Sequence, residues 1–131
     1  MFLYSSAYGD KMAHEKNIDI AIEPSHSVSN LQIITLKGYF DIVTSRYVDE
    51  QVLPLMKTGK SDFILDVSDL EYLSSIGMMS ITKYQLLLTK KKRHLKLIKP
   101  PKPIFDVMAT FGFTKRFEMY DSVVEAVSSL R

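Results

Sequence analysis

The clearest pattern near the start of the chain is an alternation of apolar and polar positions. Isoleucine occupies positions 18, 20 and 22, with polar or small residues between, as in a strand with one buried face. Pro24 ends this stretch. Residues 25–30 form a turn before a second apolar stretch at 31–36, and a turn of that length allows an antiparallel return. The two stretches therefore predict a β-hairpin.

The pattern becomes helical near Thr44. Thr44 or Ser45 is the expected cap, and Gly59 closes the element. Pro54 lies inside the pattern and is expected to kink or end the helix, because proline has no N–H to donate. The predicted apolar face consists of Tyr47, Val48, Val52, Leu55 and Met56.

Residues 63–67 form a nearly continuous apolar run, which is typical of a strand covered on both faces. An apolar helix is predicted from Ile76 to about Thr89. Its inward side chains are expected to be Met79, Leu86 and Leu87. A short strand at 95–98 follows, and prolines mark the turn after it.

The last part of the chain predicts two further helices. Apolar residues from Ile104 to Phe111 keep helical spacing, and Gly112 stops that helix. Residues 117–119 fit a small edge strand. Asp121 or Ser122 caps the final helix, with Glu125 in capping-box relation to Ser122.

These elements have the order β-β-α-β-α-β-α-β-α. An opening hairpin followed by repeated βα units predicts a single α/β domain with a mixed sheet of four to five strands and about four helices. With 131 residues, the chain has room for one core. We assign the domain to residues 17–131 and an N-terminal extension to residues 1–16.

The composition excludes several classes of protein. The absence of cysteine excludes disulfides and thiolate metal sites. A net charge of +2 is too small to indicate a nucleic-acid or membrane partner by itself. The sequence has no apolar run long enough to span a membrane and does not begin with a signal peptide. These observations predict a cytoplasmic protein that stands free of a transporter.

Ser74 and Ser75 lie where the apolar strand gives way to the helix. A helix start presents unpaired N–H groups and a partial positive charge, which suit both a serine cap and a phosphate. For a serine at such a position, the cap is the more common role. The sequence around the two serines indicates whether a role beyond capping is expected.

Five segments, in order, resemble those of the STAS family, the small domains shared by sulphate transporters and bacterial anti-sigma factor antagonists. The resemblance covers about Ile18 to Leu130. Leu-Lys-Gly-Tyr-Phe-Asp at 36–41 is similar to the family's L-x-G-E-L-D. The other matching segments are Phe-Ile-Leu-Asp-Val-Ser at 63–68, Leu-Glu-Tyr-Leu-Ser-Ser-Ile-Gly-Met at 70–78, Phe-Gly-Phe at 111–113 and Tyr-Asp-Ser at 120–122.

The resemblance implies a non-catalytic interaction switch, an anti-sigma factor antagonist, with no cofactor. In that family an anti-sigma factor kinase phosphorylates the serine at the position of Ser75, and Ser74 is the second choice here. The implied partners are an anti-sigma factor with serine kinase activity and a serine phosphatase, and the implied state is a monomer or weak dimer. The partner-binding positions that the resemblance implies are Asp41, Ser74, Ser75, Ile76, Gly77 and Met78.

Three residues depart from the family pattern. Ser74 stands where many members have aspartate, Ile76 is bulkier than the usual residue, and Tyr39 replaces an acidic residue. Part of the polar surface that the family would present is therefore missing.

Catalysis at Ser75 is the first alternative. A nucleophilic serine needs a base within hydrogen-bond reach, but His94 lies at the far end of the predicted helix, about 25 Å away. Asp41, Asp66 and Asp69 could suggest a metal, yet an aspartate at a strand end is more often a cap or turn residue. We expect neither a catalytic nor a metal site.

A basic run is the second alternative. Seven of the 17 lysines and arginines lie between Lys90 and Lys102, with no acid among them. Such a run could bind nucleic acid or acidic lipid, but cations at a helix end more often complement its dipole. We expect the cluster on the opposite side of the domain from Ser75. A STAS module of another partner-switching pathway is the third alternative.

Overall fold

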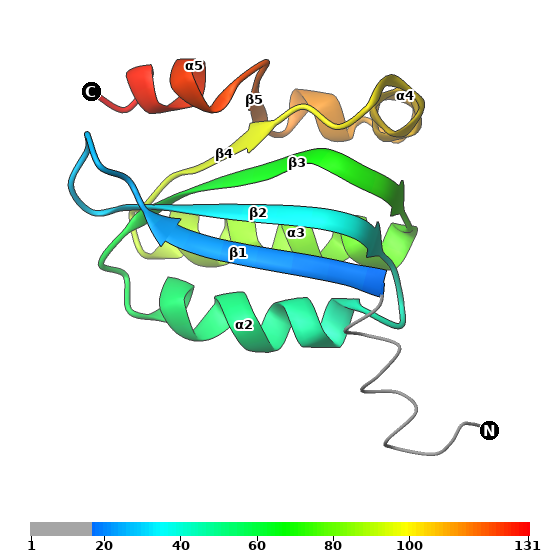
Figure 1. Cartoon of the computed structure of the whole chain (residues 1–131), viewed down its shortest axis with the longest axis horizontal. Coiled ribbons are helices and arrows are strands. Elements are labelled where there is room, and N and C mark those ends of the chain that lie inside the picture. The colour runs from blue at the N-terminus through cyan, green and yellow to red at the C-terminus, as the bar shows by residue number, and fades with distance from the viewer. Residues whose placement is uncertain (1–16) are drawn as a thin grey trace.

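A five-stranded sheet, ordered β1-β2-β3-β4-β5, forms the centre of the computed structural model, which describes residues 17–131 (Figure 1). β1 is antiparallel to β2, and the remaining neighbours are parallel. The predicted hairpin and mixed sheet are confirmed. The extension assigned to residues 1–16 lies outside the described residues. The strands are β1 (Ile18–Pro24), β2 (Leu31–Phe40), β3 (Asp62–Leu73), β4 (Leu95–Ile98) and β5 (Glu118–Tyr120).

Four α-helices connect or follow the strands in residues 17–131, in the order that the sequence predicts. They are α2 (Ser45–Lys57), α3 (Ser75–Lys90), α4 (Lys102–Thr110) and α5 (Val123–Ser128), and a 3₁₀ turn, η1 (Phe113–Lys115), follows α4. None of these helices is long and apolar enough to cross a membrane.

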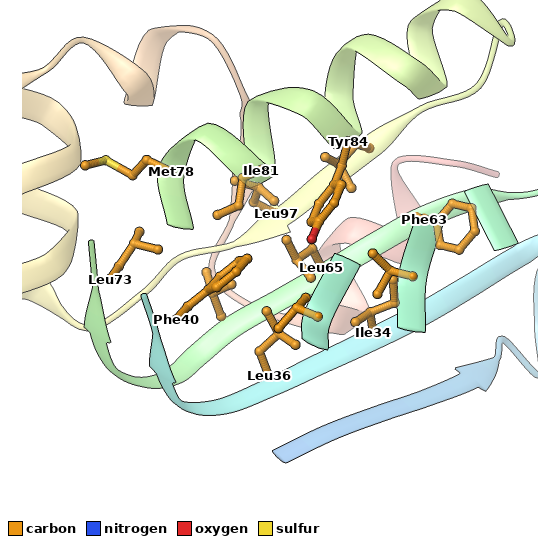
Figure 2. Close-up of a cluster of buried hydrophobic side chains, with 14 of the residues drawn as sticks. Ile34, Leu36, Phe40, Phe63, Leu65, Leu73, Met78, Ile81, Tyr84 and Leu97 are labelled. Atoms are coloured by element: carbon orange, nitrogen blue, oxygen red, sulfur yellow. The ribbon is translucent and has the colours of Figure 1, made fainter. Parts of the chain in front are cut away.

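The two faces of β3 contribute to separate hydrophobic clusters, because neighbouring side chains on a strand point to opposite faces. Phe63 and Leu65 join the larger cluster, to which α2 and α3 also contribute buried side chains. Figure 2 shows part of this cluster, between the strands and α3. Ile64 joins a smaller cluster with Ala126 and Val127 of α5. The prediction that this strand is covered on both faces is confirmed.

β3 is longer than the sequence predicted, because it continues past Val67 to Leu73. Its pairing with β2 shifts register twice, between Thr35 and Lys37 and between Gly38 and Tyr39 of β2. At each shift β3 carries one extra residue, as in a β-bulge. In β3 the buried side chains after Val67 are therefore Leu70 and Leu73. Because they are three residues apart, this part of the strand lacks the two-residue alternation by which strands are predicted.

The inward face of α3 was predicted correctly only for Leu87, which is half-buried and packs against the main core. Met79 and Leu86 are 63% and 59% exposed, whereas Ile81, Tyr84 and Leu88 are buried. Apolar residues occur all around this helix, so their spacing alone does not identify the buried face.

Leu55, predicted on the buried face of α2, is exposed. Pro54 does not end the helix, which continues to Lys57. Because Pro54 lies on the exposed side of the helix, water can hydrate the carbonyl group that proline leaves without a helical N–H partner.

A partly buried hydrogen bond joins α2 to α3. The Tyr84 hydroxyl donates to the Asp49 carboxylate, which also forms an ion pair with Lys83. Burial, followed by the hydrogen bond and charge of Asp49, raises the pKa of Tyr84 far above its usual range. Tyr84 therefore stays protonated and acts as a structural donor between the helices.

A second ion pair joins β4 to β5. Lys96 Nζ lies 2.6 Å from Glu118 Oε1, and the lysine side chain is only 7% exposed. The hydrogen bond from Lys96 lowers the pKa of the Glu118 carboxyl group below its usual value. Lys96, although part of the basic run, is thus buried and pairs β4 with β5.

We expect Glu118→Gln to reduce the loss of stability in acid. A carboxylate whose pKa is lowered by folding stabilises the native state above its unfolded pKa of about 4.3, and this contribution disappears as the pH falls through the lower folded value. Urea denaturation at several pH values should show a steeper fall in unfolding free energy for wild type than for the variant. The exposed Glu23→Gln is the control, and identical pH profiles for wild type and Glu118→Gln would contradict the expectation.

Candidate functional site

The carbonyl group of Phe40 joins the end of β2 to the start of α3. It accepts a hydrogen bond of 3.0 Å from the Ser74 backbone N–H. A Cβ atom added to Gly77 would lie 2.6 Å from the same oxygen and 2.7 Å from Leu73 Cδ1. The first turn of α3 therefore fits against β2 because position 77 has no side chain. Figure 2 shows Phe40, Leu73 and Met78 gathered at this junction.

Ser74 is the N-cap of α3. Its hydroxyl oxygen accepts a hydrogen bond of 3.1 Å from the Gly77 N–H, and its backbone is extended, as is typical of a cap. The predicted start at Ile76 is one residue late, since the helix begins at Ser75. Of the two serines, Ser74 thus has the structural role, and its side chain is half-buried.

Ser75 is exposed at the first helical position. No group in the described part of the chain hydrogen-bonds to its hydroxyl. The first turn of α3 contains no acidic residue that would offset the partial positive charge at the start of this 16-residue helix. The hydroxyl is therefore accessible, and its surroundings favour an added negative charge.

Asp41 lies next to this junction in the chain, directly after Phe40. Its carboxylate accepts hydrogen bonds from the backbone N–H groups of Val43 and Thr44, at 2.9 and 3.1 Å. The Thr44 hydroxyl in turn donates to the Tyr39 carbonyl, at 2.7 Å. Asp41 therefore shapes the loop that leads into α2. The Phe40–Ser74 hydrogen bond brings this loop to the start of α3.

The three residues after Ser75 become progressively less accessible. Ile76 is half-buried, Gly77 is buried against Phe40, and Met78 is only 4% exposed in the main core. Met78 therefore has almost no surface to offer a partner. Of the positions that the resemblance implies, Asp41, Ser74, Ser75 and Ile76 have side chains within reach of a partner.

Exposed apolar side chains adjoin the site, and sequence reasoning did not identify them as a group. Tyr39 and Tyr72 are paired across β2 and β3, with ring centroids 6.0 Å apart. Ile42 and Val43 are exposed in the loop after β2. The replacement of an acidic residue by Tyr39 was one signal of this surface, but the bulges in β3 concealed the position of Tyr72.

Two of the three aspartates that could have suggested a metal, Asp41 and Asp66, have local structural roles. Asp66 accepts hydrogen bonds from the backbone N–H and the hydroxyl of Ser68. Asp41 holds the loop before α2, as described above. Within residues 17–131, no three histidine, aspartate or glutamate side chains gather as a metal site would require.

The basic run between Lys90 and Lys102 is divided in space. Lys90 to Arg93 lie at the C-terminal end of α3, opposite Ser75, and Arg93 donates to the carbonyl groups of Gly59 and Lys60. The rest of the run does not join that group. Lys96 is buried, whereas Lys99 and Lys102 are paired with Asp121 and Asp106. The expectation of one cluster opposite Ser75 therefore holds only for its first part.

Comparisons with known proteins point to one family. The model of the STAS domain matches residues 19–126. No curated protein sequence is significantly similar to the chain.

Solved structures share the fold at low sequence identity. An anti-sigma factor antagonist from Mycobacterium paratuberculosis is 18% identical with a TM-score of 0.75, over 86% of this chain and 93% of that one. The phosphorylated form of the Bacillus cell fate determinant SpoIIAA is 16% identical with a TM-score of 0.65, over 85% and 100%. The murine Slc26a9 anion transporter is 16% identical with a TM-score of 0.66, but the match covers only 21% of that chain and 85% of this one.

The two serines should respond differently to alanine. Ser74→Ala removes the cap of α3 and should lower the unfolding free energy by about 1 kcal/mol. Ser75→Ala removes an exposed hydroxyl without a described partner and should change it by less than about 0.5 kcal/mol. Chemical denaturation of both variants tests this difference. A larger loss for Ser75→Ala would mean that Ser75 supports the helix.

Gly77→Ala should destabilise the domain although alanine is the better helix former. Overpacking against the Phe40 carbonyl costs about 1–3 kcal/mol, and the gain in helix propensity returns at most about 1 kcal/mol. We expect a net loss of about 1–2 kcal/mol by chemical denaturation. Thr89→Ala, at an exposed position of the same helix, should be neutral or slightly stabilising. A stabilised Gly77→Ala would show that the junction tolerates a side chain.

Proposed function

Because this chain belongs to the STAS domain family, we propose that it is an anti-sigma factor antagonist controlled by phosphorylation of Ser75. In its unphosphorylated form it binds an anti-sigma factor that is also a serine kinase. Phosphorylation of Ser75 by that kinase releases the complex, and a serine phosphatase restores binding. Sigma factors act with RNA polymerase, so this function places the protein in the cytoplasm.

The accessibility of Ser75 is the observation that carries this proposal. A kinase must reach the hydroxyl, and Ser75 is exposed, whereas the neighbouring Ser74 hydroxyl is half-buried and used as a cap. A phosphate on Ser75 would also meet the N-terminal end of α3 with no acid in its first turn. Since negative charge at a helix start is favourable, the domain itself should tolerate the modification.

The physical effect of the phosphate therefore falls on the partner. Phosphorylation adds about 1.5 to 2 negative charges. A like charge placed across an interface costs several kcal/mol, which is enough to break a complex of micromolar affinity. Release then requires no change of fold.

The proposed contact surface combines polar and apolar groups. Asp41, Ser74, Ser75 and Ile76 form its centre. Tyr39 and Tyr72 extend it along the sheet, and exposed aromatic side chains are frequent anchors of protein interfaces. Gly77 and Met78 support the surface from below, through the Phe40 junction and the core.

Structural relatives support the general kind of function. The protein from Mycobacterium paratuberculosis is an anti-sigma factor antagonist, and SpoIIAA has been solved in phosphorylated and unphosphorylated forms. The same fold in Slc26a9 means that the fold alone does not select this function. The free hydroxyl at Ser75 is what favours the switch.

A STAS module of another partner-switching pathway is the alternative. It would use the same Ser75 surface with a partner that does not bind a sigma factor. Nucleic-acid binding is less favoured, because the basic run is divided and Lys96, Lys99 and Lys102 have acidic partners. Catalysis at Ser75 is also less favoured, since no base among residues 17–131 is hydrogen-bonded to its hydroxyl.

Pull-downs from the protein's own cell extract, with unmodified and phosphorylated chain, test the proposal. The partner should be an anti-sigma factor kinase that phosphorylates wild type and Ser74→Ala once but leaves Ser75→Ala unmodified. Ser75→Asp should weaken binding to that partner at least tenfold, about 1.4 kcal/mol. Its melting temperature should remain near that of wild type.

Variants at the far end of α3 provide the control. Lys91→Ser and Lys92→Ser lie at the end of the helix opposite Ser75 and should leave partner affinity unchanged. Phosphate on Ser74, or a loss of affinity that merely follows a loss of stability, would contradict the proposed role of Ser75. A phosphorylation-sensitive partner unrelated to sigma factors would instead support the alternative pathway.

A further inference from the structure

A groove runs along the outer side of α3, between that helix and η1. We call it the α3–η1 groove; its volume is about 490 Å³, and eight side chains line it. Four of them are apolar: Met79, Leu86, Leu87 and Phe113. Small-molecule sites in proteins typically measure about 300–1,000 Å³ and are mostly apolar. The groove therefore has the size and lining of a small-ligand site.

The two walls of the groove are held in place. Gln85 Nε2 on α3 donates a hydrogen bond of 2.7 Å to the Arg116 carbonyl oxygen, just after η1. Phe113 stacks on Phe117, with ring centroids 6.1 Å apart, and Phe117 is buried in the core. A ligand would thus enter a groove that is already formed, which reduces the cost of binding.

The other four lining residues are Thr82 and three cations, Lys83, Lys90 and Arg116, with no acid among them. Lys83 is held by Asp49, but Lys90 and Arg116 have no acidic partner among residues 17–131. The Arg116 guanidinium lies 5.8 Å from the centre of the Phe113 ring, so its charge is held against the apolar wall. These two free cations favour an anionic group on the ligand.

The length of the groove limits the length of the apolar part of a ligand. Met79 and Lys90 are eleven residues apart on α3, which corresponds to about 16 Å along the helix. An alkyl chain can lie along this distance with its anionic head at Lys90 or Arg116. A protein partner would need more surface, since a stable interface uses about 20–30 residues on each side.

We propose that the α3–η1 groove binds a single small amphiphile that has an anionic head and an alkyl or acyl chain. Met79 lies one turn after Ser75, so the bound chain would end beside the proposed phosphorylation site. Binding itself requires neither Ser75 nor a protein partner. Failure of the switch and failure of this site can therefore be distinguished.

Titration of the full ¹⁵N-labelled chain with dodecanoate, below its micelle concentration, tests the site. We expect saturable binding, with amide shifts concentrated at Met79, Leu86 and Phe113. The dodecyltrimethylammonium cation, which has the same chain length but opposite charge, should bind at least tenfold more weakly. Equal affinity for the two amphiphiles, or shifts spread over the surface, would overturn the proposal.

Two neighbouring charge reversals give a matched pair of variants. Arg116→Glu should weaken dodecanoate binding at least tenfold, whereas Lys115→Glu, which is exposed outside the groove lining, should bind like wild type. Leu86→Glu changes an exposed floor residue and should abolish binding with the melting temperature retained. Equal losses for Arg116→Glu and Lys115→Glu would overturn the site.

Other occupants are outcomes of the same experiments. An acidic amphipathic helical peptide that binds the groove more tightly than dodecanoate would identify a protein-docking surface and overturn the small-ligand proposal. A dimer in light scattering that Leu86→Glu dissociates would assign the groove to a second copy of the chain and would likewise overturn it. Normal dodecanoate binding by Ser75→Ala is expected whether or not Ser75 is a switch.

Discussion

The close approach of α3 to the carbonyl group of Phe40 is the constraint on which the candidate site depends. The Ser74 N–H bonds to this oxygen, and Gly77 can pass it only because a side chain is absent. With the backbone fixed in this way, the Ser74 hydroxyl caps the helix and Ser75 faces solvent. The same contact brings the Asp41 loop to the start of the helix. A side chain at position 77 would push α3 away from β2, and would thereby alter the cap, the exposure of Ser75 and the position of the Asp41 loop together.

The adjacent serines show how a short sequence can hold one hydroxyl as a helix cap and leave the next one accessible, as the proposed switch would require. A cap must direct its oxygen toward the helix, and a modification site must direct its oxygen toward solvent. One residue could not do both at once, because the cap oxygen is engaged with the Gly77 N–H. Serine at position 74, where many family members have aspartate, keeps the capping role without adding a fixed negative charge beside Ser75.

Sequence patterns predicted the element order, the hairpin and the strand-to-helix junction, because each depends on local periodicity or on short segments of recognisable composition. The predictions failed where the periodicity was interrupted, or where apolar residues occupied every side of an element. Because the bulges interrupt the alternation in β3, the strand was predicted to end at Val67. Because apolar residues occur on all sides of α3, Met79 and Leu86 were predicted to be buried although they are exposed. Sequence patterns also could not show that the basic run meets Glu118, Asp121 and Asp106, since only the last of these is close in sequence. The role of Ser75 cannot be read from its type, because it depends on which of two hydroxyls the backbone turns outward.

The strand order has a consequence for the synthesis of the protein. The strands lie in the sheet in the same order as in the chain, so each new strand pairs with the one made just before it. No strand must be inserted between two that are already paired. A nascent chain can therefore extend its sheet from one edge as it leaves the ribosome, and at each stage the strand made last presents the edge with which the next strand will pair.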